Sequence, residues 1–401
     1  MRCKDLKLVF IHSAEKVKRD SLGTLYTDGS YNDEIWKMYL KVFSSITLVM
    51  REDENIYSVL EAKEKFNEIP KENISFISLP NLSNSMKSYF SINLRKERDK
   101  IIKKAINEAD AVIVRIPGID KAINFAKDNK KICLAEVVGC PFDSLWNHSF
   151  KGKILAPISY LQMRIAVKKA DNLIYVTEKF LQKRYPTKGN SIGCSDVRLT
   201  QLDKNKLENR IKKISDFKNS KIIIGTASGL GVKYKGQQYV IKALSNLKKD
   251  GWNNFEYQIA GNGNKSYLEK IIKKYNVSDC VNFVGSIPHN EIFDWYDSLD
   301  VYIQPSKQEG LPRALVEAMS CAIPCMGSKV GGIPELLTNS VIFKKGSVKE
   351  IEKILLKMLD PDFRREQSKK CFDKSRKYQV EILEKRRIDF MRKIFEVKNE
   401  K

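Results

Sequence analysis

The sequence predicts an α/β protein built from two Rossmann-like, doubly wound domains. Short apolar stretches of strand length alternate along the whole chain with stretches whose apolar residues have helical spacing. The alternation restarts near residue 220, after a polar, lysine-rich stretch at 201–219 that we interpret as a linker. Strands that alternate with helices form mostly parallel sheets with helices on both faces. Because such sheets bind ligands at the carboxyl ends of their strands, we expect the chemistry in a cleft between the domains.

The first series of elements begins with a buried strand at residues 6–11. A helix is expected next at 31–43, where Ile35, Met38, Tyr39 and Val42 recur at helical spacing. The series then continues with strands at 46–50, 111–116, 131–137 and 172–176, and with helices at 94–108, 121–129, 158–169 and 178–184.

The second series repeats the same order from residue 221. Its expected strands are 221–225, 255–260, 281–284, 301–303, 323–326 and 341–343, and its expected helices are 236–250, 266–275, 289–298, 312–320, 332–337 and 348–359. We therefore place the N-terminal domain at 1–205 and the C-terminal domain at 206–375, followed by a C-terminal helix within 376–401. This helix is expected to pack its apolar side on the protein, with a membrane-surface helix as the alternative.

Composition excludes several classes of protein. The chain has 401 residues, of which 42% are hydrophobic and 30% are charged, so it can form large cores. No apolar run approaches the roughly 20 residues of a membrane span. Its eight cysteines include no CxxC pair, which favours reduced thiols in a cytoplasmic protein. The net charge of +23 is shared by both halves, so no nucleic-acid module is expected and an anionic membrane surface is a possible partner.

Two glutamates eight positions apart form the most informative pattern. Glu309 is expected in a loop after a strand, and Glu317 lies about two turns into the helix that follows. Gly310 between them allows a ligand to approach the backbone closely. The start of the helix offers free N–H groups and a positive dipole, which suit phosphate oxygens. The carboxylates can accept hydrogen bonds from hydroxyls, one of a sugar and the other of a ribose.

Further segments around this pair carry a resemblance to a known family. The chain resembles the retaining glycosyltransferase family 4, whose members have the GT-B fold and use sugar nucleotides. The resemblance extends over about residues 221–359 and rests on the two glutamates and on Lys235-Gly236, the turns at 260–263 and 283–287, the run 317–324, and Gly331-Gly332-Ile333-Pro334-Glu335.

The resemblance implies a role for each matching residue. Glu309 would contact hydroxyls of the donor sugar, Glu317 would hold the ribose, and the backbone of Gly310 and Leu311 would meet the phosphates or the sugar. Lys235 would contact the diphosphate, although Lys233 could take that part. The family often has an arginine directly after an upstream glycine, but residues 225–231 contain none. The residues expected to pack around the base are Gly261, Gly263, Gly285 and Ile287.

The N-terminal domain is expected to bind the acceptor. Gly29, before the first helix, could lie against phosphate or serve only as part of a helix cap. Asp143 and His148 follow a strand and are candidates for the acceptor side, with a structural polar loop as the alternative. The many cations between residues 151 and 188 would suit a phosphate-bearing lipid, or a solvated helix face.

The resemblance implies a retaining transferase that moves a sugar from a nucleotide diphosphate, UDP first among them, to a glycan or a lipid-linked acceptor. The expected product is a surface polysaccharide such as a capsule or O-antigen, made on the inner face of the plasma membrane by a peripheral protein. No Asp-x-Asp pair follows a strand, so no metal or other cofactor is expected. The alternatives are a sugar-nucleotide epimerase of the same fold and a basic protein that binds nucleic acid or anionic lipid.

Overall fold

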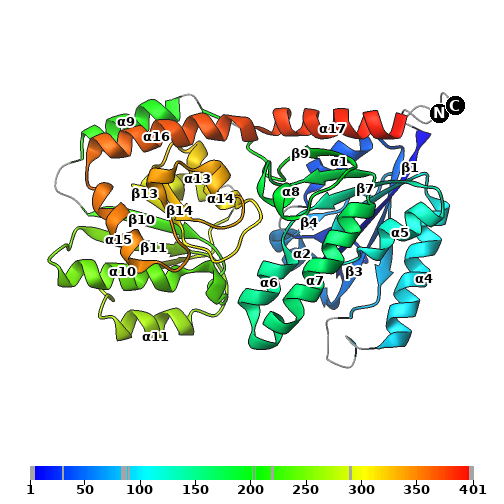
Figure 1. The fold of residues 1–401 in the computed structure, drawn as a ribbon, viewed down its shortest axis with the longest axis horizontal. Helices are drawn as coiled ribbons and strands as arrows, with labels where there is room; N and C mark the ends of the chain where they lie inside the picture. Colours follow the sequence, from blue (N-terminus) through cyan, green and yellow to red (C-terminus); the bar gives the residue numbers. More distant parts are fainter. Residues whose placement is uncertain are drawn as a thin grey trace. The chain divides into compact units, whose positions relative to one another are not determined.

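The computed structural model divides into two compact units. It describes residues 5–28, 31–82, 88, 91–200, 202–203, 205–217, 221–288 and 291–396. Unit 1 comprises Met1–Phe142, Pro157–Cys194 and Glu384–Lys401, and unit 2 comprises Asp143–Ala156 and Ser195–Leu383. Each unit is built around its own sheet (Figure 1).

In the described part of unit 1, the sheet is nine-stranded and mostly parallel. Its parallel strands run in the order β5-β3-β1-β6-β7-β8-β9, and β2 and β4 add an antiparallel extension to β1. The strands are β1 (Lys7–Asp20), β2 (Leu25–Thr27), β3 (Ser45–Tyr57), β4 (Asn67–Glu68), β5 (Ile74–Leu79), β6 (Ala111–Ile116), β7 (Ile132–Val137), β8 (Asn172–Tyr175) and β9 (Asn190–Gly193).

Helices cover both faces of this sheet. One face packs Ile106, Ile123 and Val167 of three helices against Val112 and Val114 of β6 in a continuous apolar core. The helices on this face are α4 (Ile92–Glu108), α5 (Lys121–Asp128), α7 (Phe150–Lys169) and α8 (Phe180–Arg184), and the remaining helices that begin in unit 1 are α1 (Asp33–Leu40), α2 (Val59–Lys65) and α6 (Pro141–His148).

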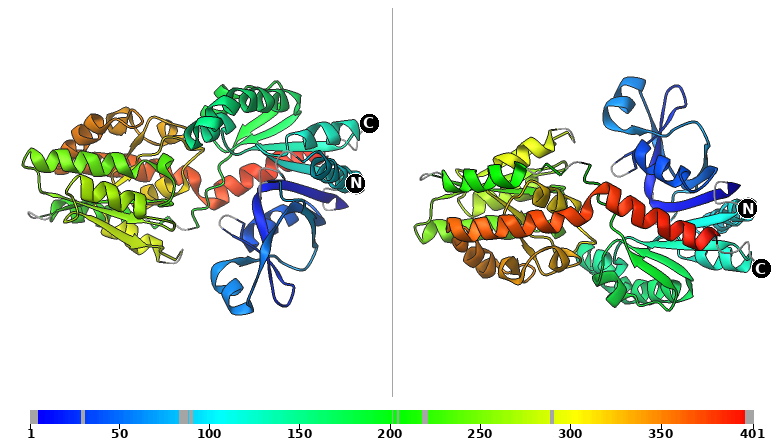
Figure 2. Two further views of the ribbon diagram at one scale, coloured as in Figure 1. Left: turned by 90° about the horizontal axis from the view of Figure 1, so that it is seen from below. Right: turned by 90° about the horizontal axis from the view of Figure 1, so that it is seen from above.

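The opposite face of the unit 1 sheet is covered by α1 and by the C-terminal helix α17 (Val380–Glu396). The Phe10 ring packs edge-on against Trp36 of α1, and Phe43 packs against Phe395 of α17. Figure 2 (right) shows α17, in red, lying along the elements of unit 1. Glu136 of β7 is 1% exposed and pairs with Arg387 of α17 as well as with Arg115, 2.7 Å away. The helix is therefore held by both apolar contacts and a buried ion pair.

The described residues of unit 2 form a parallel sheet of six strands in the order β12-β11-β10-β13-β14-β15. The strands are β10 (Ile222–Ala227), β11 (Phe255–Ala260), β12 (Val281–Gly285), β13 (Val301–Gln304), β14 (Cys325–Ser328) and β15 (Ile342–Phe343). The helices are α9 (Asn205–Ser215), α10 (Gln237–Lys249), α11 (Ser266–Lys274), α12 (Ile292–Ser298), α13 (Arg313–Ser320), α14 (Ile333–Leu336), α15 (Val348–Lys357) and α16 (Pro361–Ser375).

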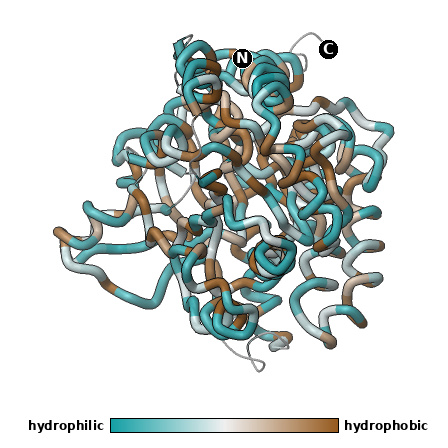
Figure 3. Tube along the Cα trace, turned by 90° about the vertical axis from the view of Figure 1, so that its left-hand side faces the viewer, coloured by the Kyte–Doolittle hydropathy of each residue, from teal (hydrophilic) through white to brown (hydrophobic). Residues whose placement is uncertain are grey.

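The helices of unit 2 again lie in two layers. Helix α10 packs beside α11 and α15, whereas α13 packs beside α12 and α16. Figure 3 shows the hydrophobic stretches, in brown, gathered mainly in the interior of the trace. This arrangement confirms the α/β class that the alternating pattern predicts.

Several elements differ from the sequence-based expectation. Strand β1 continues to Asp20 through an irregular register against β3, and β5, whose only fully buried residue is Leu79, was not expected. The stretch at 201–219, expected to be a linker, contains α9. This helix is polar in composition, yet it buries Arg210 and Ile214, and Arg210 donates hydrogen bonds to the carbonyl oxygens of Tyr296 and Asp297.

Among the described residues, no helix is both long enough and apolar enough to cross a lipid bilayer.

Candidate active site

Glu309 lies in the loop that leaves the carboxyl end of β13. One of its oxygens, Oε1, accepts hydrogen bonds from Lys235 Nζ at 2.8 Å and Ser306 Oγ at 2.6 Å. Gln304 Nε2 donates to the same oxygen at 3.1 Å. These three hydrogen bonds orient the Glu309 side chain. It is 11% exposed, so a small part of it is accessible at the surface of unit 2. A carboxylate held in this way has a fixed direction before any ligand arrives.

Lys235 is brought to Glu309 by the turn between β10 and α10. It ends a short 3₁₀ helix, Lys233–Lys235, and Gly236 follows with a φ of 85°, which favours glycine. A Cβ on Gly236 would lie 1.9 Å from the carbonyl oxygen of Pro305, so a side chain would separate the two loops. The backbone N–H of Lys307 also donates to the Tyr234 carbonyl at 2.7 Å. Lys233, in contrast, lies over the Tyr267 ring.

A second close backbone contact fixes the peptide after Glu309. The Gly332 N–H donates to the carbonyl oxygen of Gly310 at 2.7 Å. A Cβ on Gly331 would lie 2.1 Å from the Glu309 carbonyl oxygen, and the φ of Gly331 is 56°. The Gly-Gly turn before α14 therefore supports the Glu309–Gly310 backbone directly, which explains why the two segments occur together.

Glu317 lies inside α13, on the same unit as Glu309 but with a different partner. Its Oε2 accepts a hydrogen bond from the hydroxyl of Tyr296 in α12, at 3.1 Å. Tyr296 is fully buried, and its pKa is raised well above its usual value by burial, with the charge of Glu317 contributing. Tyr296 therefore remains a neutral donor that orients the Glu317 carboxylate.

The N-terminus of α13 faces the same loop. Leu311 and Pro312 precede the first helical residue, Arg313, and Pro312 provides no side-chain cap. Free N–H groups at a helix start attract anions such as phosphate.

The glycines expected near the base lie in two turns that approach one another. The Gly261 N–H donates to the Gly285 carbonyl at 2.7 Å, and a Cβ on Gly261 would lie 2.1 Å from the Ser228 carbonyl oxygen. A Cβ on Gly263 would lie 3.0 Å from the Gly231 nitrogen. Ile287 follows β12 and is half-buried. These positions bring the backbones after β10, β11 and β12 together.

The candidates for the acceptor side lie on α6 or outside the described residues. Asp143 is half-buried in the first turn of α6, and His148 is exposed at its last residue. Between them, Asn147 Nδ2 donates to Gln308 Oε1 at 3.0 Å, so it is Asn147 that hydrogen-bonds the residue before Glu309. Gly29 lies outside the described residues.

Sequence reasoning missed Gln304, Ser306 and Tyr296. Gln304 and Ser306 connect Tyr302 to Glu309, because the Tyr302 hydroxyl donates to Gln304 Oε1 and Gln304 Nε2 donates to Ser306 Oγ, both at 2.9 Å. Both lie at the carboxyl end of the parallel strand β13, and this position could have indicated that they belong to the site. Tyr296 belongs to another helix, and nothing in the local sequence indicates its contact with Glu317.

The two doubly wound units have the architecture of the GT-B fold. Solved structures with the same fold include sucrose-phosphate synthase from Thermosynechococcus elongatus, with a TM-score of 0.70 and 15% identity over 98% of this chain and 99% of that one. The Anabaena protein HepE, solved in complex with UDP-glucose, has a TM-score of 0.62 and 14% identity over 96% of this chain and 99% of that one.

The chain belongs to the family described as glycosyl transferases group 1, which matches residues 208–378. It is 32% identical to Protein CapJ of Staphylococcus aureus over 359 residues, which cover 87% of this chain and 85% of CapJ. It is also 35% identical to the amylovoran biosynthesis glycosyltransferase AmsK of Erwinia amylovora, over 31% of this chain and 33% of AmsK. The prediction of a glycosyltransferase with the GT-B fold is confirmed, whereas its assignment to family 4 stays a prediction.

Proposed function

We propose that this protein is a retaining glycosyltransferase that moves a sugar from a nucleoside diphosphate, UDP first among them, to a glycan or lipid-linked acceptor of a surface polysaccharide. The observation that carries the proposal is the contact between Lys235 and Glu309. It lies next to the N-terminus of α13, which has no side-chain cap. This arrangement offers a cation and free N–H groups for a diphosphate, beside an oriented carboxylate for sugar hydroxyls.

The proposed reaction places each group where charge changes. The bond between the sugar C1 and the diphosphate oxygen breaks, and negative charge develops on the leaving diphosphate near Lys235 and the start of α13. The acceptor hydroxyl forms the new bond to C1 from the same face, and its proton passes to the leaving phosphate oxygen. Glu309 holds the sugar by its hydroxyls during this exchange, and Glu317 holds the ribose.

The choice of donor and product is supported by the related proteins. HepE was solved with UDP-glucose, and AmsK is named for the biosynthesis of amylovoran. A capsule or similar polysaccharide is the corresponding product here. We further propose that the protein works without a metal ion, because Lys235 and the helix dipole supply the positive charge, and that it associates peripherally with a membrane.

The test is a screen of sugar nucleotides for release of the nucleoside diphosphate, with and without EDTA. We expect turnover of one UDP-sugar that survives EDTA, and NMR of the product should show the anomeric configuration of the donor. Loss of activity in EDTA with rescue by Mn²⁺ would contradict metal independence. A product of opposite configuration would contradict retention, and release of an epimerised free sugar nucleotide would identify an epimerase instead.

A further inference from the structure

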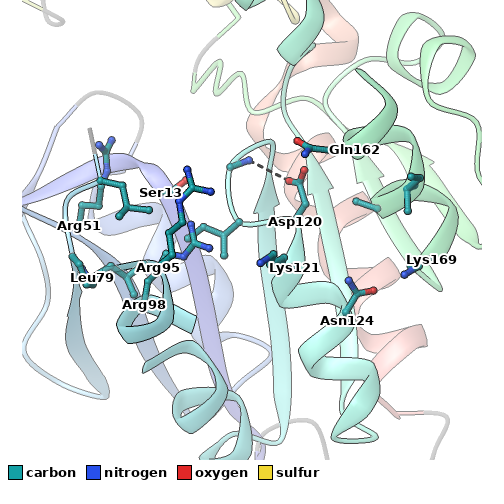
Figure 4. A pocket seen from close by; sticks show the side chains of 16 residues that line it. Ser13, Arg51, Leu79, Arg95, Arg98, Asp120, Lys121, Asn124, Gln162 and Lys169 are labelled. Carbon is teal, nitrogen blue, oxygen red and sulfur yellow. Dashed lines mark hydrogen bonds between the residues drawn. The ribbon is translucent and has the colours of Figure 1, made fainter. Parts of the chain in front are cut away.

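Unit 1 contains a cavity of about 520 Å³ that is separate from the residues assigned to the donor (Figure 4). The arginines on its wall come from β3 and α4, and its lysines come from α5 and α7. One carboxylate, that of Asp120, lines it together with five cationic side chains, which are Arg51, Arg95, Arg98, Lys121 and Lys169. Among the described residues that line the cavity, the cationic side chains therefore outnumber the acidic ones by five to one.

The cations are arranged so that a further anion can be shared between them. Arg98 Nη2 is 2.7 Å from Asp99 Oδ1, and Lys121 Nζ is 3.5 Å from Asp99 Oδ2, so one carboxylate serves both. Arg51 donates to the Ala14 carbonyl oxygen at 2.9 Å and to Asn81 Oδ1 at 3.4 Å, and the charge of Glu15 also acts on it. Guanidinium groups bind phosphate oxygens through paired N–H bonds, and several of them around one cavity favour a group with more than one negative charge.

One part of the remaining cavity wall is apolar, whereas Ser13, Asn124 and Gln162 add neutral polar groups elsewhere. The apolar residues include Leu79 at the end of β5, Ile119 in the turn between β6 and α5, and Ile165 of α7. A cavity of this size can hold a phosphate or diphosphate together with part of an attached group. The apolar wall favours a ligand whose phosphate carries an apolar chain over a free phosphate ion.

Helix α7 continues this apolar wall onto the surface. Ile158, Leu161 and Ile165 recur at helical spacing and are 53%, 57% and 55% exposed. Ile165 also lines the cavity, so the two features are continuous. Five basic residues and no acidic residue occur in α7, as its printed sequence from Phe150 to Lys169 shows. An exposed apolar stripe flanked by cations is the pattern of a helix that lies on an anionic membrane surface.

We propose that this cavity binds the phosphate or diphosphate of a lipid-linked acceptor, and that the α7 stripe of Ile158, Leu161 and Ile165 rests on the membrane that carries the lipid. That the bound lipid is the acceptor rests on the function proposed above, whereas the binding of a lipid phosphate does not. The cavity would hold the lipid by its phosphate beside the membrane-bound stripe, and the attached glycan would extend away from the membrane.

The experiment measures binding of the full chain to phosphatidylcholine vesicles that carry a polyprenyl diphosphate, compared with vesicles that carry the matching polyprenol. We expect the wild type to prefer the diphosphate vesicles. The double variant R95Q/R98Q should lose at least about tenfold in affinity for them, as expected for charge-assisted hydrogen bonds. The matched control is K96Q/K100Q, which removes two exposed charges from the same helix and lies outside the cavity. It should bind like the wild type.

A second variant separates the two parts of the proposal. Changing Ile158 and Leu161 to serine should weaken binding to the vesicles but leave binding of inorganic diphosphate in solution unchanged. Equal binding to diphosphate and polyprenol vesicles would overturn the proposal, as would equal losses in R95Q/R98Q and K96Q/K100Q. Tighter, arginine-dependent binding of a single-stranded oligonucleotide than of the lipid would point to nucleic acid instead.

Calorimetric binding of UDP distinguishes this proposal from the proposed function. R95Q/R98Q should bind UDP like the wild type, because the arginines belong to unit 1 and the donor residues to unit 2. A wild-type protein that binds the lipid diphosphate through these arginines, but turns over no sugar nucleotide, would support the lipid site and reject the transferase.

Discussion

The two units share a doubly wound architecture but use the ends of their strands differently. In unit 2, glycine turns bring three loops into backbone contact, and the Glu309 carboxylate has three hydrogen-bond donors. In unit 1, the strand ends open into a cavity lined by long cationic side chains from four elements. The comparison teaches that one fold can build the ends of its strands in two ways, from backbone held in close contact in unit 2 and from long side chains in unit 1.

The largest expected effect tests whether unit 1 is stabilised independently of the donor site. Glu136→Gln removes the charge that pairs with Arg115 and Arg387 in the interior, and a buried charge left without its partner costs about 3–5 kcal/mol. Denaturant unfolding should show this loss, and UDP binding should stay unchanged at low denaturant.

The control for that variant also involves an arginine of α17. Glu178 is 40% exposed and lies 3.8 Å from Arg386, so Glu178→Gln should change stability by less than about 1 kcal/mol. Loss of UDP binding in Glu136→Gln would break the comparison, because the two units would then not be energetically separable.

Lys235→Ala is expected to have the largest effect on chemistry. Removing a preorganised group that stabilises developing charge lowers kcat by roughly 100–1,000-fold. Lys242→Ala, an exposed residue of α10, is the control and should retain wild-type kcat. Steady-state rates for both variants, with melting curves to verify folding, decide whether the chemistry depends on the rigid loops of unit 2.

Glu309→Gln should lower kcat and kcat/KM together by about 10–150-fold, since a hydrogen bond to a charged group is worth about 1.5–3 kcal/mol. The reason is that Glu309 is proposed to contact the sugar that moves, where interactions change as the bond breaks. A variant with normal kcat/KM would contradict the assigned donor site.

Glu317→Gln should instead raise the KM of the donor, by about tenfold, with a smaller change in kcat. Glu317 is expected to hold the ribose equally in the ground state and the transition state. Tyr296→Phe, which removes the 3.1 Å hydrogen bond to Glu317, should change KM in the same direction by less. If the two glutamates exchange these patterns, the donor site stands and only the division of roles is wrong.

The smallest expected effect concerns pH and unit 1. Burial, followed by the hydrogen bond and charge of Asp28, raises the pKa of Glu15 from 4.5 to about 7. The folded state therefore binds this proton more tightly than the unfolded chain, so the stabilisation is complete below pH 4.5 and is lost as the pH rises through about 7. Thermal melts of Glu15→Gln should show a weaker decline over this range than the wild type. Identical declines would show that Glu15 does not titrate in this way.

The sequence predicts the loops of unit 2 well because their signals are local. Glu309, Gly310 and Glu317 lie within one strand–loop–helix segment, and the glycine turns that support them have their own short motifs. Tyr296 could not be found in this way, because it reaches Glu317 from another helix.

Unit 1 is harder to predict because its features are assembled from distant segments. Strand β3 continues into a polar stretch that includes Glu52, Asp53 and Glu54, which hides its extent in the sequence. The cavity combines residues from Ser13 to Lys169, and each of its cations alone is one of many in a basic chain. Only the three-dimensional arrangement reveals that five of them share one space.

The packing of α17 on unit 1 has a consequence for synthesis on the ribosome. Unit 1 is completed by Glu384–Lys401, so the contact of Phe43 with Phe395 and the Arg387–Glu136 pair cannot form until these residues, which follow all of unit 2 in the sequence, have been synthesised. Every segment of unit 2, including α16 and the start of α17 up to Leu383, emerges before them. The unit whose synthesis starts first is thus completed last, and during elongation its apolar face opposite α17 is exposed to aggregation.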